Sequence, residues 1–124
     1  MTTTFFLIRH AAHDNVGAYL AGRMAGVCLG DTGRAQALRL ASHMAPKPLA
    51  AICCSPRERA LETAKPIAIA CSPDKITICQ ELDEIDFGAW SGKTFEELNQ
   101  DADWRVWNSR RQQARTPGGE TMLD

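Results

Sequence analysis

An alternation of short apolar runs with helical patterns limits, more than any other feature, the folds open to this chain. Residues 4–9, 49–54 and 75–79 are short and rich in apolar and β-branched side chains, which is typical of strands buried in a sheet. Helical patterns lie between them, at about 32–44 and from 55 to about 70. Strand–helix–strand units form parallel sheets covered by helices. We therefore predict an α/β fold, a three-layer sandwich with a mostly parallel sheet.

The starts of two helices are marked by capping patterns. Ser55 can cap the helix that follows it, Pro56 suits the first helical position, and Glu58 completes a capping box. Thr94 heads a second capping box and predicts a helical region that extends to about residue 110. In that region Trp104 and Trp107 could line a pocket, but their spacing favours packing.

Composition narrows the class of protein. A chain of 124 residues supports one domain with its own core. The formal net charge of −1 argues against nucleic acid or an anionic membrane as a partner. The apolar run near the N-terminus, residues 5–8, is too short for a membrane span or a signal peptide. Five cysteines, at no metal-like spacing, indicate reduced thiols, and we predict a cytoplasmic protein without a metal site.

Parallel sheets bind ligands beyond the carboxyl ends of their strands, and three charged segments fall there. The first is Arg9–His10, although a single histidine at a strand end is more often structural than catalytic. The second contains Arg59, in the first turn of a predicted helix, where the backbone N–H groups and a guanidinium can grip phosphate. A solvated surface arginine is an equal alternative for Arg59 and the better interpretation of Arg57. The third contains Glu84, one of four acidic residues that composition cannot tell apart.

Five segments, in order, resemble the motifs of one family. Leu7-Ile8-Arg9-His10 resembles an "R-H-G" strand end, and residues 55–64 (SPRERALETA) resemble "S-P-x-x-R-A-x-x-T-A". Residues 82–92 (LDEIDFGAWSG) resemble "L-x-E-x-x-F-G-x-W-x-G". Residues 29–33 loosely match "L-T-x-x-G", and residues 117–120 match "P-G-G-E". Together these segments resemble the histidine phosphatase superfamily, whose fold is phosphoglycerate mutase-like.

The resemblance implies a mechanism for a small-molecule phosphoester substrate. His10 would accept the phosphoryl group, and Arg9 and Arg59 would hold its oxygens. Glu84 would protonate the leaving oxygen and later activate water. Asn15 would contact phosphate if one residue is missing from this loop. No metal or other cofactor is implied, because the arginines supply the positive charge.

The sequence departs from the family pattern in three places. Ala11 follows the histidine where the family has glycine, and Ala12-His13 replaces an acidic or amide residue followed by a hydroxyl residue. The family also has a second histidine after the "P-G-G-E" turn, whereas no histidine follows His43 here. We therefore expect a single histidine phosphatase domain over residues 1–124 that is incomplete at its C-terminus. Truncation is the favoured explanation; the other is a shortened relative that completes its sheet by association, as in a homodimer.

Three functions follow from the resemblance. The segment from Glu81 to Gly92 leads at once into the next predicted helix, which leaves little room for a lid over the site. A mutase needs such a lid to keep its intermediate from water. We therefore predict a phosphatase, with mutase-type phosphotransfer as an alternative. The rival from another class is a catalytically silent phosphoester-binding module that lacks the second histidine.

Overall fold

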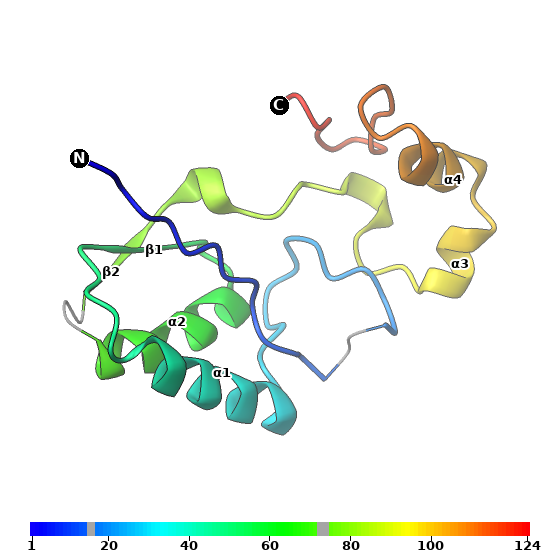
Figure 1. Ribbon diagram of the computed structural model, residues 1–124. Coiled ribbons are helices and arrows are strands. Elements are labelled where there is room, and N and C mark those ends of the chain that lie inside the picture. Colours follow the sequence, from blue (N-terminus) through cyan, green and yellow to red (C-terminus); the bar gives the residue numbers. More distant parts are fainter. Residues whose placement is uncertain (15–16, 72–74) are drawn as a thin grey trace.

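The computed structural model describes residues 1–14, 17–71 and 75–124, and it shows an α/β arrangement (Figure 1). Strands β1 (Ile52–Cys54) and β2 (Ile76–Ile78) pair in parallel, with Ile52 opposite Ile76. The predicted α/β class with parallel pairing is confirmed. The remaining elements are α1 (Asp31–Met44), α2 (Glu58–Ala70), the 3₁₀ turns η1 (Gln80–Leu82) and η2 (Gly88–Trp90), α3 (Phe95–Asn99) and α4 (Ala102–Ser109).

Two apolar clusters form the core. In the first, α1 packs on α2, and α2 lies against the β1–β2 pair (Figure 1). The buried side chains of this cluster are Ala41, Met44, Ile67 and Cys71. The second cluster, at the other end of the molecule, joins η2 to α3 and α4 through Trp90, Leu98, Trp104 and Trp107. Trp104 and Trp107 are therefore packing residues, as their spacing favours.

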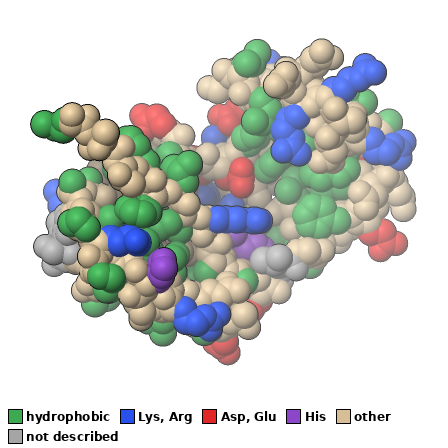
Figure 2. Space-filling view, viewed as in Figure 1, with side chains coloured by type: hydrophobic (Ala, Val, Ile, Leu, Met, Phe, Trp, Pro, Cys, Tyr) green, Lys and Arg blue, Asp and Glu red, His purple; other side chains and the backbone are tan. Residues whose placement is uncertain are grey.

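The predicted strand at residues 4–9 is wrong. This segment is extended but has no strand partner among the described residues, and Phe5 and Leu7 are 80% and 95% exposed. Figure 2 shows hydrophobic side chains exposed on the surface of the molecule. An apolar run forms a strand only where a neighbour pairs with its backbone, and sequence periodicity does not reveal whether that neighbour is present.

Of the two predicted helix starts, the one at Ser55 differs in the structure and the one at Thr94 is confirmed. The N-cap of α2 is Arg57, so the helix begins two residues later than the capping box suggests. Ser55 Oγ accepts a hydrogen bond from the Arg57 amide, and the Glu58 carboxylate accepts one from the Gly26 amide at 3.0 Å. Ser55 therefore accepts from the Arg57 amide rather than from the Glu58 amide, and Glu58 accepts from Gly26 rather than from Ser55. The Thr94 cap is confirmed, since its hydroxyl accepts from the Glu97 amide.

The helical region predicted from Thr94 to about residue 110 is two helices. A break after α3 lets Asp101 cap α4, where its carboxylate accepts from the Asp103 amide at 2.8 Å. Among the described residues, no helix has the length and apolar character needed to cross a membrane.

Residues 117–120 form a turn that packs against residues 86–89. The Ala89 amide donates to the Pro117 carbonyl, and the Glu120 amide donates to the Asp86 carbonyl, both at 2.8 Å. Gly88 lies in this contact with φ +58°, and a Cβ there would lie 2.0 Å from the Pro117 carbonyl oxygen. Only glycine fits at this position.

Replacing Gly88 with alanine tests this contact. Gly88→Ala forces a left-handed backbone on a residue with a Cβ and adds an overlap, so we expect a loss of about 2–4 kcal/mol in unfolding free energy. Gly118→Ala is the matched control, because Gly118 has φ +75° with no atom within 4 Å of the added Cβ. It should lose only about 1 kcal/mol in the same denaturant titration. Equal losses in the two variants would contradict the docking contact.

Candidate active site

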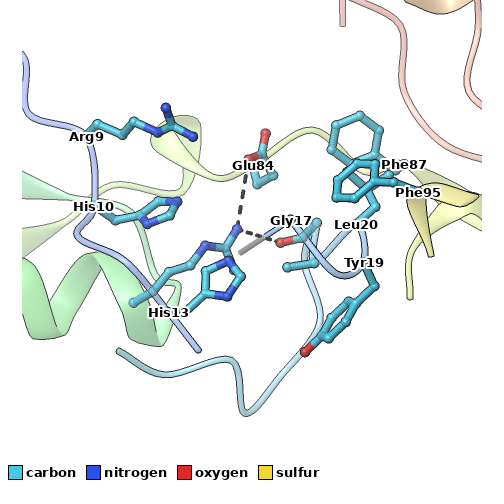
Figure 3. A pocket seen from close by; sticks show the side chains of 12 residues that line it. Arg9, His10, His13, Gly17, Tyr19, Leu20, Glu84, Phe87 and Phe95 are labelled. Atoms are coloured by element: carbon cyan, nitrogen blue, oxygen red, sulfur yellow. Dashed lines mark hydrogen bonds and ion pairs between the residues drawn. The ribbon is translucent and has the colours of Figure 1, made fainter. Parts of the chain in front are cut away.

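A cavity of about 200 Å³ lies between the two clusters and brings together four of the five predicted site residues (Figure 3). Arg9 and His10 come from the extended N-terminal segment, Arg59 from the first turn of α2, and Glu84 from the segment after η1. The surface is hollowed here, and basic, acidic and histidine side chains gather at the hollow (Figure 2). Asn15, the fifth predicted residue, lies outside the described residues.

The orientation of the His10 ring follows from its hydrogen bond. Nδ1 lies 2.8 Å from the carbonyl oxygen of Ala11. A carbonyl only accepts, so Nδ1 carries the proton and the lone pair of the neutral ring is on Nε2. His10 is half-buried and lines the cavity. This tautomer provides a nucleophilic nitrogen without a separate base.

The backbone after His10 is fixed to both α1 and α2. The Ala11 amide donates to Thr63 Oγ1 at 3.0 Å, and the Thr63 hydroxyl donates to the Arg59 carbonyl at 2.8 Å. The Ala12 amide donates to Gln36 Oε1 at 3.0 Å. Thr63 is only 3% exposed and therefore links the His10 segment directly to the helix that carries Arg59. Sequence reasoning did not identify Thr63, although it lies within the motif at residues 55–64.

Arg59 is a buried cation with an unused donor. It is 3% exposed, and its Nη2 donates to the Gly22 carbonyl at 2.8 Å and lies 3.9 Å from Glu84 Oε2. Its Nη1 is buried and makes no hydrogen bond to the described residues. A buried guanidinium nitrogen without a partner is costly, and Arg59 lines the cavity, so its guanidinium is a cation available to an anion bound there. The alternative of a solvated surface arginine does not hold for Arg59.

A network of ion pairs holds the segment of Glu84. Asp83 Oδ1 lies 2.9 Å from Arg57 Nε and accepts from the Glu84 amide at 2.8 Å. Arg23 Nε lies 3.4 Å from Asp83 Oδ2 and donates to the Glu84 carbonyl at 2.5 Å. Arg23 also donates to both carboxylate oxygens of Glu120 at 3.0 Å. The backbone of Glu84 is thus fixed, while its side chain is 41% exposed at the cavity.

The environment of Arg57 differs from the one that the sequence favoured. The sequence favoured a solvated surface residue, whereas its side chain is 22% exposed and pairs with Asp83. Arg57 also donates to the Arg23 carbonyl at 2.6 Å, so it ties α2 to the loop before α1. No local pattern indicates these partners, because Arg23 and Asp83 are both distant in the sequence.

His13 also lines the cavity, and its ring centroid lies 5.9 Å from that of His10 (Figure 3). Burial, with the charges of His10 and Arg59, lowers the pKa of His13 below its ordinary value of 6.5. A neutral His13 can still donate a hydrogen bond to a phosphate oxygen. Among the described residues, no group of three or more His, Cys, Asp or Glu side chains could hold a metal ion.

Comparisons with known proteins agree on one family. The sequence pattern of the histidine phosphatase superfamily (branch 1) matches residues 5–124. The structure of a mycobacterial glucosyl-3-phosphoglycerate phosphatase superposes with a TM-score of 0.80 at 27% identity, covering 93% of this chain. The α-ribazole phosphatase of Shigella flexneri gives 0.81 at 27% identity over 94% of this chain. A phosphoserine phosphatase of Entamoeba histolytica gives 0.71 at 28% identity over 86%.

The chain is shorter than these relatives. It spans 54%, 58% and 52% of the lengths of the three solved chains. An uncharacterized protein of Mycobacterium tuberculosis is 41% identical over 66 residues, which are 53% of this chain and 33% of that protein. The superpositions place the chain in the phosphoglycerate mutase-like α/β fold, of which it spans about half.

Substitutions at Thr63 test the link between the His10 segment and α2. Thr63→Val keeps the shape but leaves the half-buried Ala11 amide without its acceptor, which should lower the unfolding free energy by about 1–3 kcal/mol. Hydrogen exchange at the Ala11 amide should also accelerate at least about fivefold, because the lost bond is worth about 1 kcal/mol or more. Thr63→Ser keeps the hydroxyl and should retain the protection. Fast exchange in both variants, or in neither, would contradict the link.

The lowered pKa of His13 predicts a contribution to the pH dependence of stability. Its folded pKa lies below the unfolded value near 6.5, so the unfolded chain binds the proton first. The stability that neutral His13 contributes is therefore present above the unfolded pKa and is lost as the pH falls toward the folded pKa. Denaturant titrations from pH 7.5 to pH 5.5 should show a smaller loss in His13→Asn than in the unsubstituted chain. Equal losses would mean that His13 protonates equally readily in both states.

Proposed function

This chain belongs to the histidine phosphatase superfamily, and we propose that it is a phosphoric monoester hydrolase that acts through a phosphohistidine at His10. The observation that carries the proposal is the buried Arg59 guanidinium, which lines the same cavity as His10 and whose Nη1 has no hydrogen-bond partner among the described residues. A phosphate dianion has the charge and the acceptor oxygens to satisfy that donor. The substrate would be a small phosphorylated molecule, and no metal or other cofactor enters the proposed reaction.

The first half-reaction uses the tautomer of His10. The Nε2 lone pair attacks phosphorus in line, a nitrogen–phosphorus bond forms, and the bond from phosphorus to the ester oxygen breaks. Glu84, in its protonated form, gives its proton to the leaving oxygen, so an alcohol departs. Arg59 and Arg9 hold the equatorial oxygens, where charge is spread in the transition state. The hydrogen bond from Nδ1 to Ala11 supports the positive charge that the ring gains.

The second half-reaction reverses these roles. The Glu84 carboxylate takes a proton from a water molecule, whose oxygen attacks phosphorus as the nitrogen–phosphorus bond breaks. The lone pair returns to Nε2 and orthophosphate leaves. The fixed backbone of Glu84 and its exposed side chain suit a group that must serve both the leaving alcohol and the incoming water.

The lack of room for a lid supports hydrolysis over mutase-type transfer. A mutase must shield its phosphohistidine from water, whereas the segment from Glu81 to Gly92 leads at once into α3 and leaves little room for a lid among the described residues. The three solved relatives compared above also have phosphatase names. The silent phosphoester-binding module remains the rival, and labelling of His10 distinguishes it from the enzyme. The cytoplasmic location, the single domain, the homodimer and the absence of nucleic-acid and membrane partners stay predictions.

Phosphate labelling tests the proposed nucleophile. After incubation with a ³²P-labelled aryl monophosphate, the chain should carry label that is stable in alkali and lost in acid, because it is a phosphoramidate. His10→Asn should remove the label entirely. His43→Asn is the matched control, because His43 lies exposed in the last turn of α1 and should leave the label unchanged. A chain that binds phosphate but never acquires label at His10 would be the silent module.

A further inference from the structure

The cavity has two chemically different ends (Figure 3). Arg9 and His10 lie at one end, with Glu84 between the ends. The opposite end is lined by side chains that carry no charge: Tyr19, Leu20, Phe87 and Phe95. A phosphoryl group held at the first end would therefore direct its leaving group toward this aromatic wall, which we define as these four residues.

The aromatic wall is already in place without a ligand. The Leu20 amide donates to the Lys93 carbonyl at 2.9 Å, and the Gly92 amide donates back to the Leu20 carbonyl at 2.8 Å. Behind the wall, the Phe87 ring packs edge-on against Trp107 with centroids 6.1 Å apart. All but Tyr19 of the four wall residues pack on the buried tryptophan cluster. Binding against a fixed wall costs little ordering entropy, so its contacts can appear as affinity.

The wall offers no cation to a charged leaving group. Within the part of the chain that the structure describes, three charged residues line the cavity: Arg9 at the phosphate end, Glu84 between the ends, and Arg59, whose Nη2 lies 3.9 Å from Glu84 Oε2. Of the neighbouring arginines, Arg57 is paired with Asp83 and Arg23 with both Asp83 and Glu120. A carboxylate placed against the wall would lose its hydration without gaining a positively charged partner, which is unfavourable.

Resting on the proposed phosphatase function, we infer that the site selects monoesters whose leaving alcohol carries a neutral aromatic or apolar group. Leaving alcohols that carry a carboxylate are disfavoured. The wall residues are then specificity determinants, whereas Arg59 and His10 act on the phosphoryl group of any substrate.

Three phosphonates test the selection without turnover, because their phosphorus–carbon bond is not cleaved. Methylphosphonate, benzylphosphonate and 3-phosphonopropionate are titrated into the chain, and dissociation constants are read from NMR shifts. We expect benzylphosphonate to bind about tenfold or more tightly than methylphosphonate, from ring contact with the wall. 3-Phosphonopropionate should bind no more tightly than methylphosphonate. Tighter binding of 3-phosphonopropionate than of benzylphosphonate would overturn the inference.

Substitutions in the aromatic wall test whether its rings bind the aromatic group of the ligand. Phe95→Leu and Phe87→Leu keep an apolar side chain but remove a ring, and each should lower the ratio of methylphosphonate to benzylphosphonate dissociation constants at least about threefold. Ile69→Ala, at a side chain 85% exposed on α2, should leave the ratio unchanged. Far-ultraviolet circular dichroism checks that each variant is folded. A ratio that neither phenylalanine substitution lowers would overturn the inference.

Arg59→Gln distinguishes failure of the inference from failure of the function. If methylphosphonate does not bind, or binds equally well to Arg59→Gln, the proposed function fails and the inference fails with it. If methylphosphonate binds in an Arg59-dependent way and benzylphosphonate binds no more tightly, the aromatic selection alone is wrong. The phosphatase proposal then stands with a different substrate class.

Discussion

The burial of the Arg59 guanidinium is the constraint on which the site depends. A charge removed from water is costly unless hydrogen bonds and opposite charge replace its hydration. The chain supplies the Gly22 carbonyl to Nη2 and places the Glu84 carboxylate 3.9 Å away, but it leaves Nη1 without a partner among the described residues. The guanidinium is thus held in place on one side and unsatisfied on the other. This arrangement suits a residue that must bind an anion and release it.

The surrounding structure positions other groups relative to Arg59. Through Thr63, the helix that carries Arg59 also holds the backbone next to His10, so the nucleophile and the cation share one support. Through Arg57 and Arg23, the Asp83 carboxylate joins the start of α2 to the segment of Glu84. Arg23 extends this connection to Glu120 in the turn that docks on Gly88. Segments far apart in the sequence therefore meet at one cavity, and several of their residues support the site rather than contact a ligand.

Local patterns predicted local structure well and long-range contacts poorly. The helix expected at 32–44 is α1 within one residue, because apolar periodicity and the prolines beyond its end are local. The Ser55 capping box failed because Glu58 accepts from Gly26, a distant amide that no local rule identifies. The exposed segment at residues 4–9 failed for a similar reason, since a strand depends on its neighbour. His10, Arg59 and Glu84 could be selected because family motifs marked them. Thr63 is the T of the motif at residues 55–64 and could have been selected in the same way. Asp83 and Arg57 occupy positions that the motifs leave open, and their importance lies in partners distant in the sequence.

A crystal structure of this chain with bound orthophosphate would show whether the buried Arg59 guanidinium binds the phosphoryl group beside His10. We expect a phosphate in the cavity, with an oxygen accepting a hydrogen bond from Arg59 Nη1 and phosphorus facing His10 Nε2. The tautomer of His10 and the Nδ1 contact with Ala11 should persist in that structure. A phosphate bound elsewhere on the surface, with Nη1 of Arg59 still unpaired at saturating concentration, would contradict this expectation.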